Sequence, residues 1–361
     1  MSRPHPLWLK GTVILLGICL LFFLLSYGKF ILMPLAFSAL IAMLLQPISR
    51  WLERYKFNRI LAILTSIALV TIVLGGIVSL LSIQLMQFAD RLPEANQKIQ
   101  AVSSDLIQFF EAQFNLSPNR QIEFLERGLE TMVDKSGQYI STALGTTTSV
   151  FTTISLLPFF VFFMMYYKNM YRTFLHKAVE GKNKAIDKVI DNIQNVTQSY
   201  IVGMMMVITI LAVLNAIGLW IVGIKHTLFF AVFAAVLAII PYIGIIIGSL
   251  PAVLFALLFT DSLLNPVAVI GVFAAVQFLE GNFITPNIVG SSVSINPFMA
   301  LIALIIGGNL WGIAGMILFV PFLGILKCIF DQVEALKPYG YLFGDRMEYQ
   351  SAGPDPEEPE P

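Results

Sequence analysis

Charged side chains are almost absent from a long stretch of this chain. Between residues 192 and 326, only Lys225, Asp261 and Glu280 carry a charge, apart from His226. The chain of 361 residues is 57% hydrophobic and 12% charged, whereas a soluble domain carries about 25% charged residues. Such a stretch has too little polar surface to fold in water and is typical of packed membrane-spanning helices. The sequence therefore predicts an all-α, polytopic transmembrane helical bundle.

Apolar runs of helical length predict about eight membrane spans. They cover residues 11–27, 30–45, 60–85, 150–167, 197–222, 228–260, 267–283 and 298–326. We expect the second span to stop or bend at Pro47, because proline lacks the amide that continues a helix. Residues 228–240 are too short to cross a bilayer, which takes about 20 residues. Residues 228–260 are therefore either one long broken helix or a re-entrant hairpin of two short helices.

The distribution of charge predicts the orientation of the spans. Basic residues gather between the second and third spans and again after the fourth, and these segments should face the cytoplasm. They are Arg50, Arg54, Lys56 and Arg59, then Lys168, Arg172, Lys177, Lys182, Lys184 and Lys188. Between the third and fourth spans, acidic residues outnumber basic ones and apolar residues recur at helical spacing. We expect a small extracytoplasmic amphipathic helical domain there, with both chain termini in the cytoplasm.

These features predict four segments. Residues 1–85 carry the first three spans, and residues 86–147 form the extracytoplasmic domain. Residues 148–330 form a transmembrane core with broken helices. Residues 331–361 form a cytoplasmic tail, largely disordered because its end is rich in Pro and Glu.

Glu280 is the main candidate for a functional residue. An ionised carboxylate at the centre of a bilayer costs about 3 kcal/mol, so it needs a partner, water or a cavity. Gln277 lies three residues earlier, on the same helical face. Other polar or helix-breaking residues follow, namely Asn282, Thr285, Pro286 and Asn287. The cluster predicts a proton or cation site, or a polar lining for a solute; alternatively, Glu280 only satisfies backbone donors where its helix ends.

A second candidate lies at a predicted helix break. Pro241, Tyr242, Gly244 and Gly248 follow one another within a very apolar run. Broken helices expose backbone groups that bind ions or polar solutes, so we include these residues in the predicted path. The spacing of the two glycines also fits close packing against another helix.

A third glycine pattern, in the last span, predicts helix packing or an oligomer contact, and its residues are Gly308, Gly312 and Gly315. The chain has only three histidines, without metal-ligand spacing, and no Walker loop. We therefore expect no enzyme activity, no catalytic residue, no metal and no cofactor. The balanced net charge gives no reason to expect a nucleic-acid partner.

Several motifs together resemble the AI-2E family of bacterial membrane proteins, over roughly residues 11–330. They are Gln46-Pro47, Pro158-Phe-Phe, Tyr166-Tyr-Lys168, Tyr200-Ile-Val-Gly203, Ile240-Pro241-Tyr242-Ile-Gly244 with Gly248 and Pro251, then Glu280 to Asn282, Pro286, Gly290 and Pro321. Many members have His or Ser where this chain has Asn296. The resemblance implies a multi-pass inner-membrane transporter that forms homo-oligomers. Members have been linked to release of autoinducer-2 and to sodium/proton antiport.

The sequence is compatible with three functions. The first is secondary export of a small polar solute, such as a quorum-sensing signal, along a path formed by Glu280 and the break at Pro241. The second is sodium or lithium/proton antiport at Glu280. The third is a membrane scaffold that transports nothing and binds a partner through residues 86–147.

Overall fold

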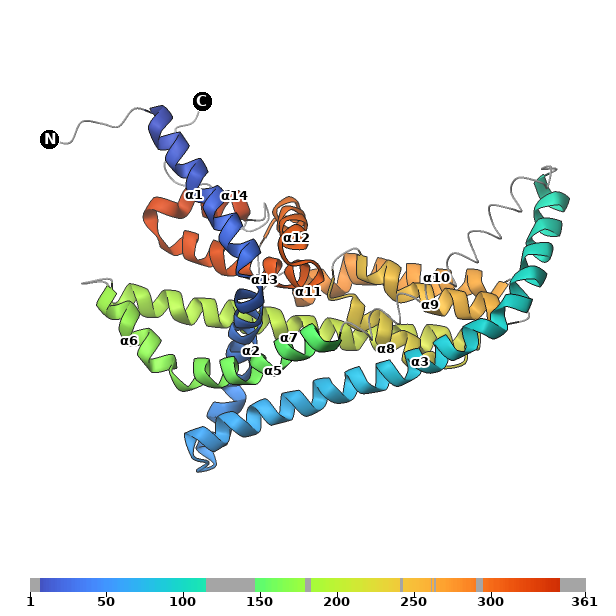
Figure 1. Ribbon diagram of the computed structural model, residues 1–361, viewed down its shortest axis with the longest axis horizontal. Helices are drawn as coiled ribbons and strands as arrows, with labels where there is room; N and C mark the ends of the chain where they lie inside the picture. The colour runs from blue at the N-terminus through green and yellow to red at the C-terminus, as the bar shows by residue number, and fades with distance from the viewer. Residues whose placement is uncertain are drawn as a thin grey trace. The chain divides into compact units, whose positions relative to one another are not determined.

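The computed structural model describes residues 7–114, 147–178, 183–240, 243–260, 262, 264–289 and 295–344. These residues are almost entirely helical (Figure 1), with one isolated β-bridge between Ile295 and Gly344. This confirms the predicted all-α class. The chain forms two compact units. Unit 1 contains Met1–Ile67, Thr153–Met204 and Asn287–Pro361, and unit 2 contains Ala68–Thr152 and Met205–Pro286.

The helices follow the apolar runs of the sequence. The N-terminal half contains α1 (Leu7–Tyr27), α2 (Lys29–Arg54), α3 (Arg59–Phe114), α5 (Thr147–Tyr166), α6 (Lys168–Ala178) and α7 (Asn183–Val222). The C-terminal half contains α8 (Thr227–Leu237), α9 (Ile243–Phe259), α10 (Leu264–Leu279), the π-helix η1 (Glu280–Ile284), α11 (Thr285–Ile288), α12 (Pro297–Trp311), α13 (Ile313–Gln332), the 3-10 helix η2 (Glu334–Leu336) and α14 (Lys337–Phe343).

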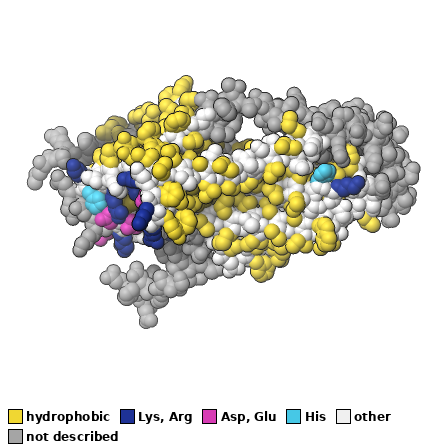
Figure 2. Space-filling view, turned by 90° about the horizontal axis from the view of Figure 1, so that it is seen from below, with side chains coloured by type: hydrophobic (Ala, Val, Ile, Leu, Met, Phe, Trp, Pro, Cys, Tyr) yellow, Lys and Arg dark blue, Asp and Glu magenta, His cyan; other side chains and the backbone are white. Residues whose placement is uncertain are grey.

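Several helices are suited to a lipid environment. Five described segments are both long and apolar enough to cross a membrane, namely Lys29–Arg54, Arg59–Gln87, Ile186–Val222, Leu264–Ile288 and Ile313–Gln332. Large apolar side chains are exposed along much of α1, including Trp8 at 71% and Ile14 at 63%. Figure 2 shows hydrophobic side chains over much of the face in view. Lipid tails can cover such a surface without the cost it would carry in water.

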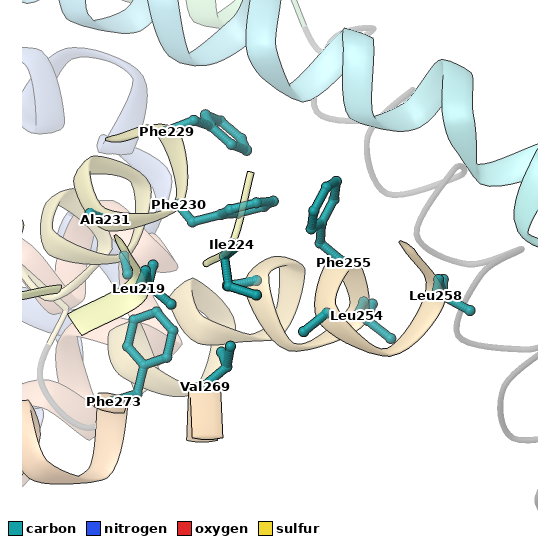
Figure 3. Close-up of a cluster of buried hydrophobic side chains, with 13 residues drawn as sticks. Leu219, Ile224, Phe229, Phe230, Ala231, Leu254, Phe255, Leu258, Val269 and Phe273 are labelled. Carbon is teal, nitrogen blue, oxygen red and sulfur yellow. The ribbon is translucent and has the colours of Figure 1, made fainter. Parts of the chain in front are cut away.

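Unit 2 is organised around a helical hairpin formed by α8 and α9. The two helices pack side by side, and α10 packs against α9. Their aromatic side chains meet in a buried cluster with the end of α7 (Figure 3), where Phe230 of α8 and Phe255 of α9 have ring centroids 5.3 Å apart. Val269 and Phe273 of α10 complete this cluster. Of the two arrangements expected for residues 228–260, the structure therefore has the hairpin.

Glycine allows the two helices of this hairpin to approach closely. A Cβ atom added at Gly248 would lie 2.7 Å from the Cα atom of Ala234, and one at Gly244 would overlap the carbonyl of Leu237. Side chains larger than hydrogen would push α9 away from α8. Gly244 and Gly248 thus lie at a close contact between two helices, which is the second role that their spacing suggested.

Unit 1 contains a second hairpin, formed by α12 and α13. The prediction of one continuous span over residues 298–326 is wrong, because the chain reverses at Gly312, whose φ is +62°. This backbone conformation is open to glycine and strained for most other residues. The two helices then pack so closely that a Cβ added at Gly315 would overlap the carbonyl of Gly307. The sequence did not indicate this turn, because residues 298–326 form one apolar run.

Of the two outcomes expected at Pro47, the stop is wrong, since α2 continues through this residue to Arg54. Pro47 has no amide to donate to the carbonyl of Met43, four residues earlier. The side chain of Gln198, on α7, replaces that donor, and its Nε2 lies 2.7 Å from the Met43 oxygen. A polar side chain from a distant segment thus satisfies the carbonyl that Pro47 leaves open.

The end of the described chain folds back onto α12 and α13. The N–H of Asn296 donates to the carbonyl of Phe343 at 3.0 Å, and Nδ2 of Asn296 donates to the carbonyl of Leu342 at 2.8 Å. The Asn296 Oδ1 also accepts from the N–H of Met299 and caps α12. The predicted tail, residues 331–361, thus begins with folded structure, and its residues 345–361 lie outside the described part.

Candidate functional site

The strongest candidate site is the π-helix η1, which begins at Glu280. It interrupts a candidate membrane span, Leu264–Ile288, between α10 and α11. The N–H of Thr285 donates to the carbonyl of Glu280, which is the five-residue spacing of a π-helix. π-helical turns within α-helices occur frequently at functional sites.

Two neutral side chains hold the carboxylate of Glu280. Nε2 of Gln277 lies 2.7 Å from one carboxylate oxygen, and the hydroxyl of Thr285 donates to the other. Gln277 comes from the last turn of α10, whereas Thr285 opens α11. In an α-helix, a residue five positions away points to a different face; the π-helix turns Thr285 so that both its amide and its hydroxyl bind Glu280.

The other predicted residues of this segment lie around the cluster rather than in it. Asn282 donates its Nδ2 to the carbonyl of Phe278 at 2.8 Å. Pro286 and Asn287 are exposed residues of α11, and Asn287 belongs to unit 1. Pro286 has no amide, so it cannot continue the α-helical hydrogen bonding of Asn282, which is consistent with the wider turn at this point.

The helix break before α9 is present, but its two central residues are not described. α8 ends at Leu237 and α9 begins at Ile243, while Pro241 and Tyr242 lie outside the described residues. Gly244 and Gly248 lie in the contact between α8 and α9.

In the last hairpin, Gly308 and Gly315 line the contact between α12 and α13, and Gly312 forms the turn. Residues 86–147 are expected to form the extracytoplasmic domain, and most of them also lie outside the described part.

The chemistry of the Glu280 cluster suits exchange of a small polar species. An amide and a hydroxyl can each either donate or accept a hydrogen bond, so Gln277 and Thr285 can serve a charged or a protonated carboxyl group. Glu280 is half-buried, which leaves part of it accessible. Within the described residues, no three His, Cys, Asp or Glu side chains gather in a way that could hold a metal ion.

Sequence reasoning found Glu280 and Gln277 from their position, but it did not foresee the π-helix. The spacing of five between Glu280 and Thr285, followed directly by Pro286, is the signal that could have indicated it. It also did not identify Gln198, because the carbonyl that this side chain satisfies belongs to a helix far away in the sequence.

Comparisons with known proteins point to transport. A sequence model described as AI-2E family transporter matches residues 12–335. The putative transport protein YrrI of Bacillus subtilis strain 168 is 28% identical over 307 residues, which cover 83% of this chain and 85% of that protein. The putative transport protein YueF of the same strain is 28% identical over 318 residues, 84% of each chain. The AI-2 transport protein TqsA of Escherichia coli K12 is 22% identical over 367 residues, 96% of this chain and 99% of that protein.

Proposed function

Because this chain belongs to the AI-2E transporter family, as its motifs predicted, we propose that it exports a small polar solute by secondary transport. Its family and its long apolar helices make this protein a multi-pass membrane transporter. The sequence contains no Walker loop, so the proposed energy source is an ion gradient or the solute gradient itself.

One observation carries this proposal: a carboxylate in a membrane span is held by two neutral polar side chains at a π-helix. Ionisable residues inside a membrane segment are costly and usually mark a pathway for a solute or ion. Between residues 277 and 285, the cluster offers a carboxylate with an amide and a hydroxyl in contact with it. These are the groups that bind the hydroxyls of a small sugar-like solute.

A second candidate, sodium or lithium/proton antiport, rests on the partners of Glu280. Gln277 and Thr285 can reverse their hydrogen bonds when the carboxyl group gains a proton. When it is ionised, the carboxylate and the Thr285 hydroxyl are oxygen ligands of the kind that hard cations prefer. A carboxylate that binds either a cation or a proton, but not both at once, can exchange one for the other across a membrane, which is antiport.

Reconstitution in liposomes tests both candidates through Glu280→Gln. This substitution keeps the shape of the side chain and removes its charge, and hydrogen bonds to charged groups contribute about 1.5–3 kcal/mol. We therefore expect efflux of a labelled small diol to fall by at least about tenfold. Glu334→Gln is the matched control, because Glu334 is an exposed residue outside the candidate spans.

The readouts separate the candidates. Diol efflux that depends on Glu280 supports export, whereas collapse of a pH gradient on addition of sodium or lithium supports antiport. Full, pH-independent activity of Glu280→Gln would exclude a role of this residue in either process. The scaffold would instead be favoured if the wild-type protein showed no transport in either assay and a partner co-purified through residues 86–147.

A further inference from the structure

Unit 1 contains a cavity of about 480 Å³, apart from the Glu280 cluster. The residues around it come from the end of α2, the start of α3, the end of α5, α6 and the start of α7. α2, α3 and α7 contain candidate membrane spans. The cavity therefore lies where apolar helices end, at the level expected for lipid headgroups.

Positive charge dominates one part of the cavity lining. Four basic side chains and a single carboxylate, Glu53, contribute to it. One of the four, Arg172, is already paired, with Asp187 at 2.6 Å and Asp191 at 3.2 Å. The remaining three are Arg50, Arg59 and Lys168, and none of them forms an ion pair with a carboxylate in the described part of the chain.

The three basic side chains are held close together by the fold. Nη2 of Arg59 donates to the carbonyls of Met165 at 3.3 Å and Tyr166 at 2.7 Å, which fixes it at the end of α5. Burial lowers the pKa of Lys168, and the charges of Arg50 and Arg59 lower it further, while the charge of Glu53 acts in the opposite direction. An anion between these groups would offset both the repulsion and the loss of solvation.

Another part of the lining is apolar. It includes the buried residues Ala42, Ile63 and Met165. Figure 2 shows most of the Lys and Arg side chains in view in one region, mixed with Asp, Glu and His side chains and next to hydrophobic surface. A soluble anion would use only the charged part, whereas a phospholipid has both a phosphate and acyl chains to fill such a cavity.

We propose that this cavity binds an anionic phospholipid, with its phosphate between Arg50, Arg59 and Lys168 and an acyl chain along the apolar lining. Basic pockets between membrane helices are suited to such headgroups, and anionic lipids are enriched where basic loops face the cytoplasm. The bound lipid joins α2, α3, α5 and α6 in one contact. This proposal does not depend on which solute the protein carries.

The test is thermal unfolding of the full chain in phosphatidylcholine-containing micelles, titrated with phosphatidylglycerol. A ligand that binds only the folded state raises the unfolding temperature in proportion to its occupancy. Each basic residue that faces an anionic headgroup contributes about fivefold in affinity, so Arg50→Gln with Lys168→Gln should weaken the apparent affinity about thirtyfold. Glu53→Gln removes the one carboxylate of the lining and should strengthen it about fivefold.

A charge-matched control separates the cavity from general surface attraction. Lys56→Gln with Lys177→Gln removes two charges from exposed residues that do not line the cavity, and it should leave the affinity within about twofold of wild type. The proposal would be overturned if the control pair weakened the apparent affinity for phosphatidylglycerol as much as Arg50→Gln with Lys168→Gln does. It would also be overturned if Glu53→Gln left this affinity unchanged. The last measurement uses inorganic phosphate. If phosphate stabilises the protein as phosphatidylglycerol does and competes with it, the site binds a soluble anion and the lipid assignment is wrong.

Discussion

The polar residues that matter most in this protein are those that satisfy groups which apolar surroundings would leave unpaired. A backbone carbonyl without a partner costs several kcal/mol in lipid. Gln198 satisfies the carbonyl that Pro47 leaves open, on Met43. Arg59 does the same for two carbonyls at the end of α5. Each side chain also joins two helices that are far apart in the sequence.

A double-mutant cycle tests the role of Gln198. Gln198→Leu alone should lower the free energy of unfolding by about 1–3 kcal/mol, because the Met43 carbonyl then loses its donor. In a Pro47→Ala background, the new amide of residue 47 can donate to that carbonyl, so the same substitution should cost less. We expect a coupling energy of about 1 kcal/mol between the two positions, measured by chemical unfolding in detergent. Additive effects would show that the hydrogen bond contributes nothing specific.

At the scale of helices, glycine determines how the hairpins form. Gly315 contacts the backbone of Gly307 across the hairpin of α12 and α13, and an added Cβ has no room there. Gly315→Ala should therefore destabilise the protein by about 1–3 kcal/mol, the usual cost of inserting a group into a packed contact. Gly75→Ala is the control, because nothing lies within 4 Å of a Cβ added at Gly75.

That control substitution should be neutral or slightly stabilising, since alanine favours a helix by up to about 1 kcal/mol over glycine. Thermal unfolding of the two purified variants measures the difference. An equal loss of stability in both would mean that helix propensity, rather than the contact between α12 and α13, determines the effect at Gly315.

The sequence determined where helices form, but not how they turn or pair. Apolar runs placed most helices, because burying or solvating an apolar stretch in lipid requires internal hydrogen bonding. Hydropathy does not distinguish one long helix from two antiparallel ones, so it gives no sign of the turn at Gly312. Pro47 looked like a helix end because the compensating donor, Gln198, is distant. The position of a charged residue within an apolar stretch points to Glu280, whereas its pairing with Thr285 depends on the π-helix.

At the scale of the whole molecule, the two hairpins lead us to expect a membrane topology that differs from eight single crossings. A helical hairpin returns the chain to the side from which it came, whereas a single span does not. If residues 228–260 and 298–326 both re-enter the membrane as hairpins instead of crossing it, we still expect both termini on one side, but with the orientation of the segment between the hairpins reversed. The pairing of Ile295 with Gly344 supports this change, since eight single crossings would separate these two residues by a membrane.

Cysteine labelling checks this topology in a background that carries Cys19→Ser and Cys328→Ser. Lys225 and Ser262 flank the hairpin of α8 and α9, and both are exposed. We expect Lys225→Cys and Ser262→Cys to react equally with a membrane-impermeant maleimide in intact cells. Lys177→Cys, before α7, should react only after permeabilisation, because the basic segment around it should face the cytoplasm. If Ser262→Cys instead needs permeabilisation while Lys225→Cys does not, residues 228–260 cross the membrane once, and α8 and α9 cannot form the hairpin in the bilayer.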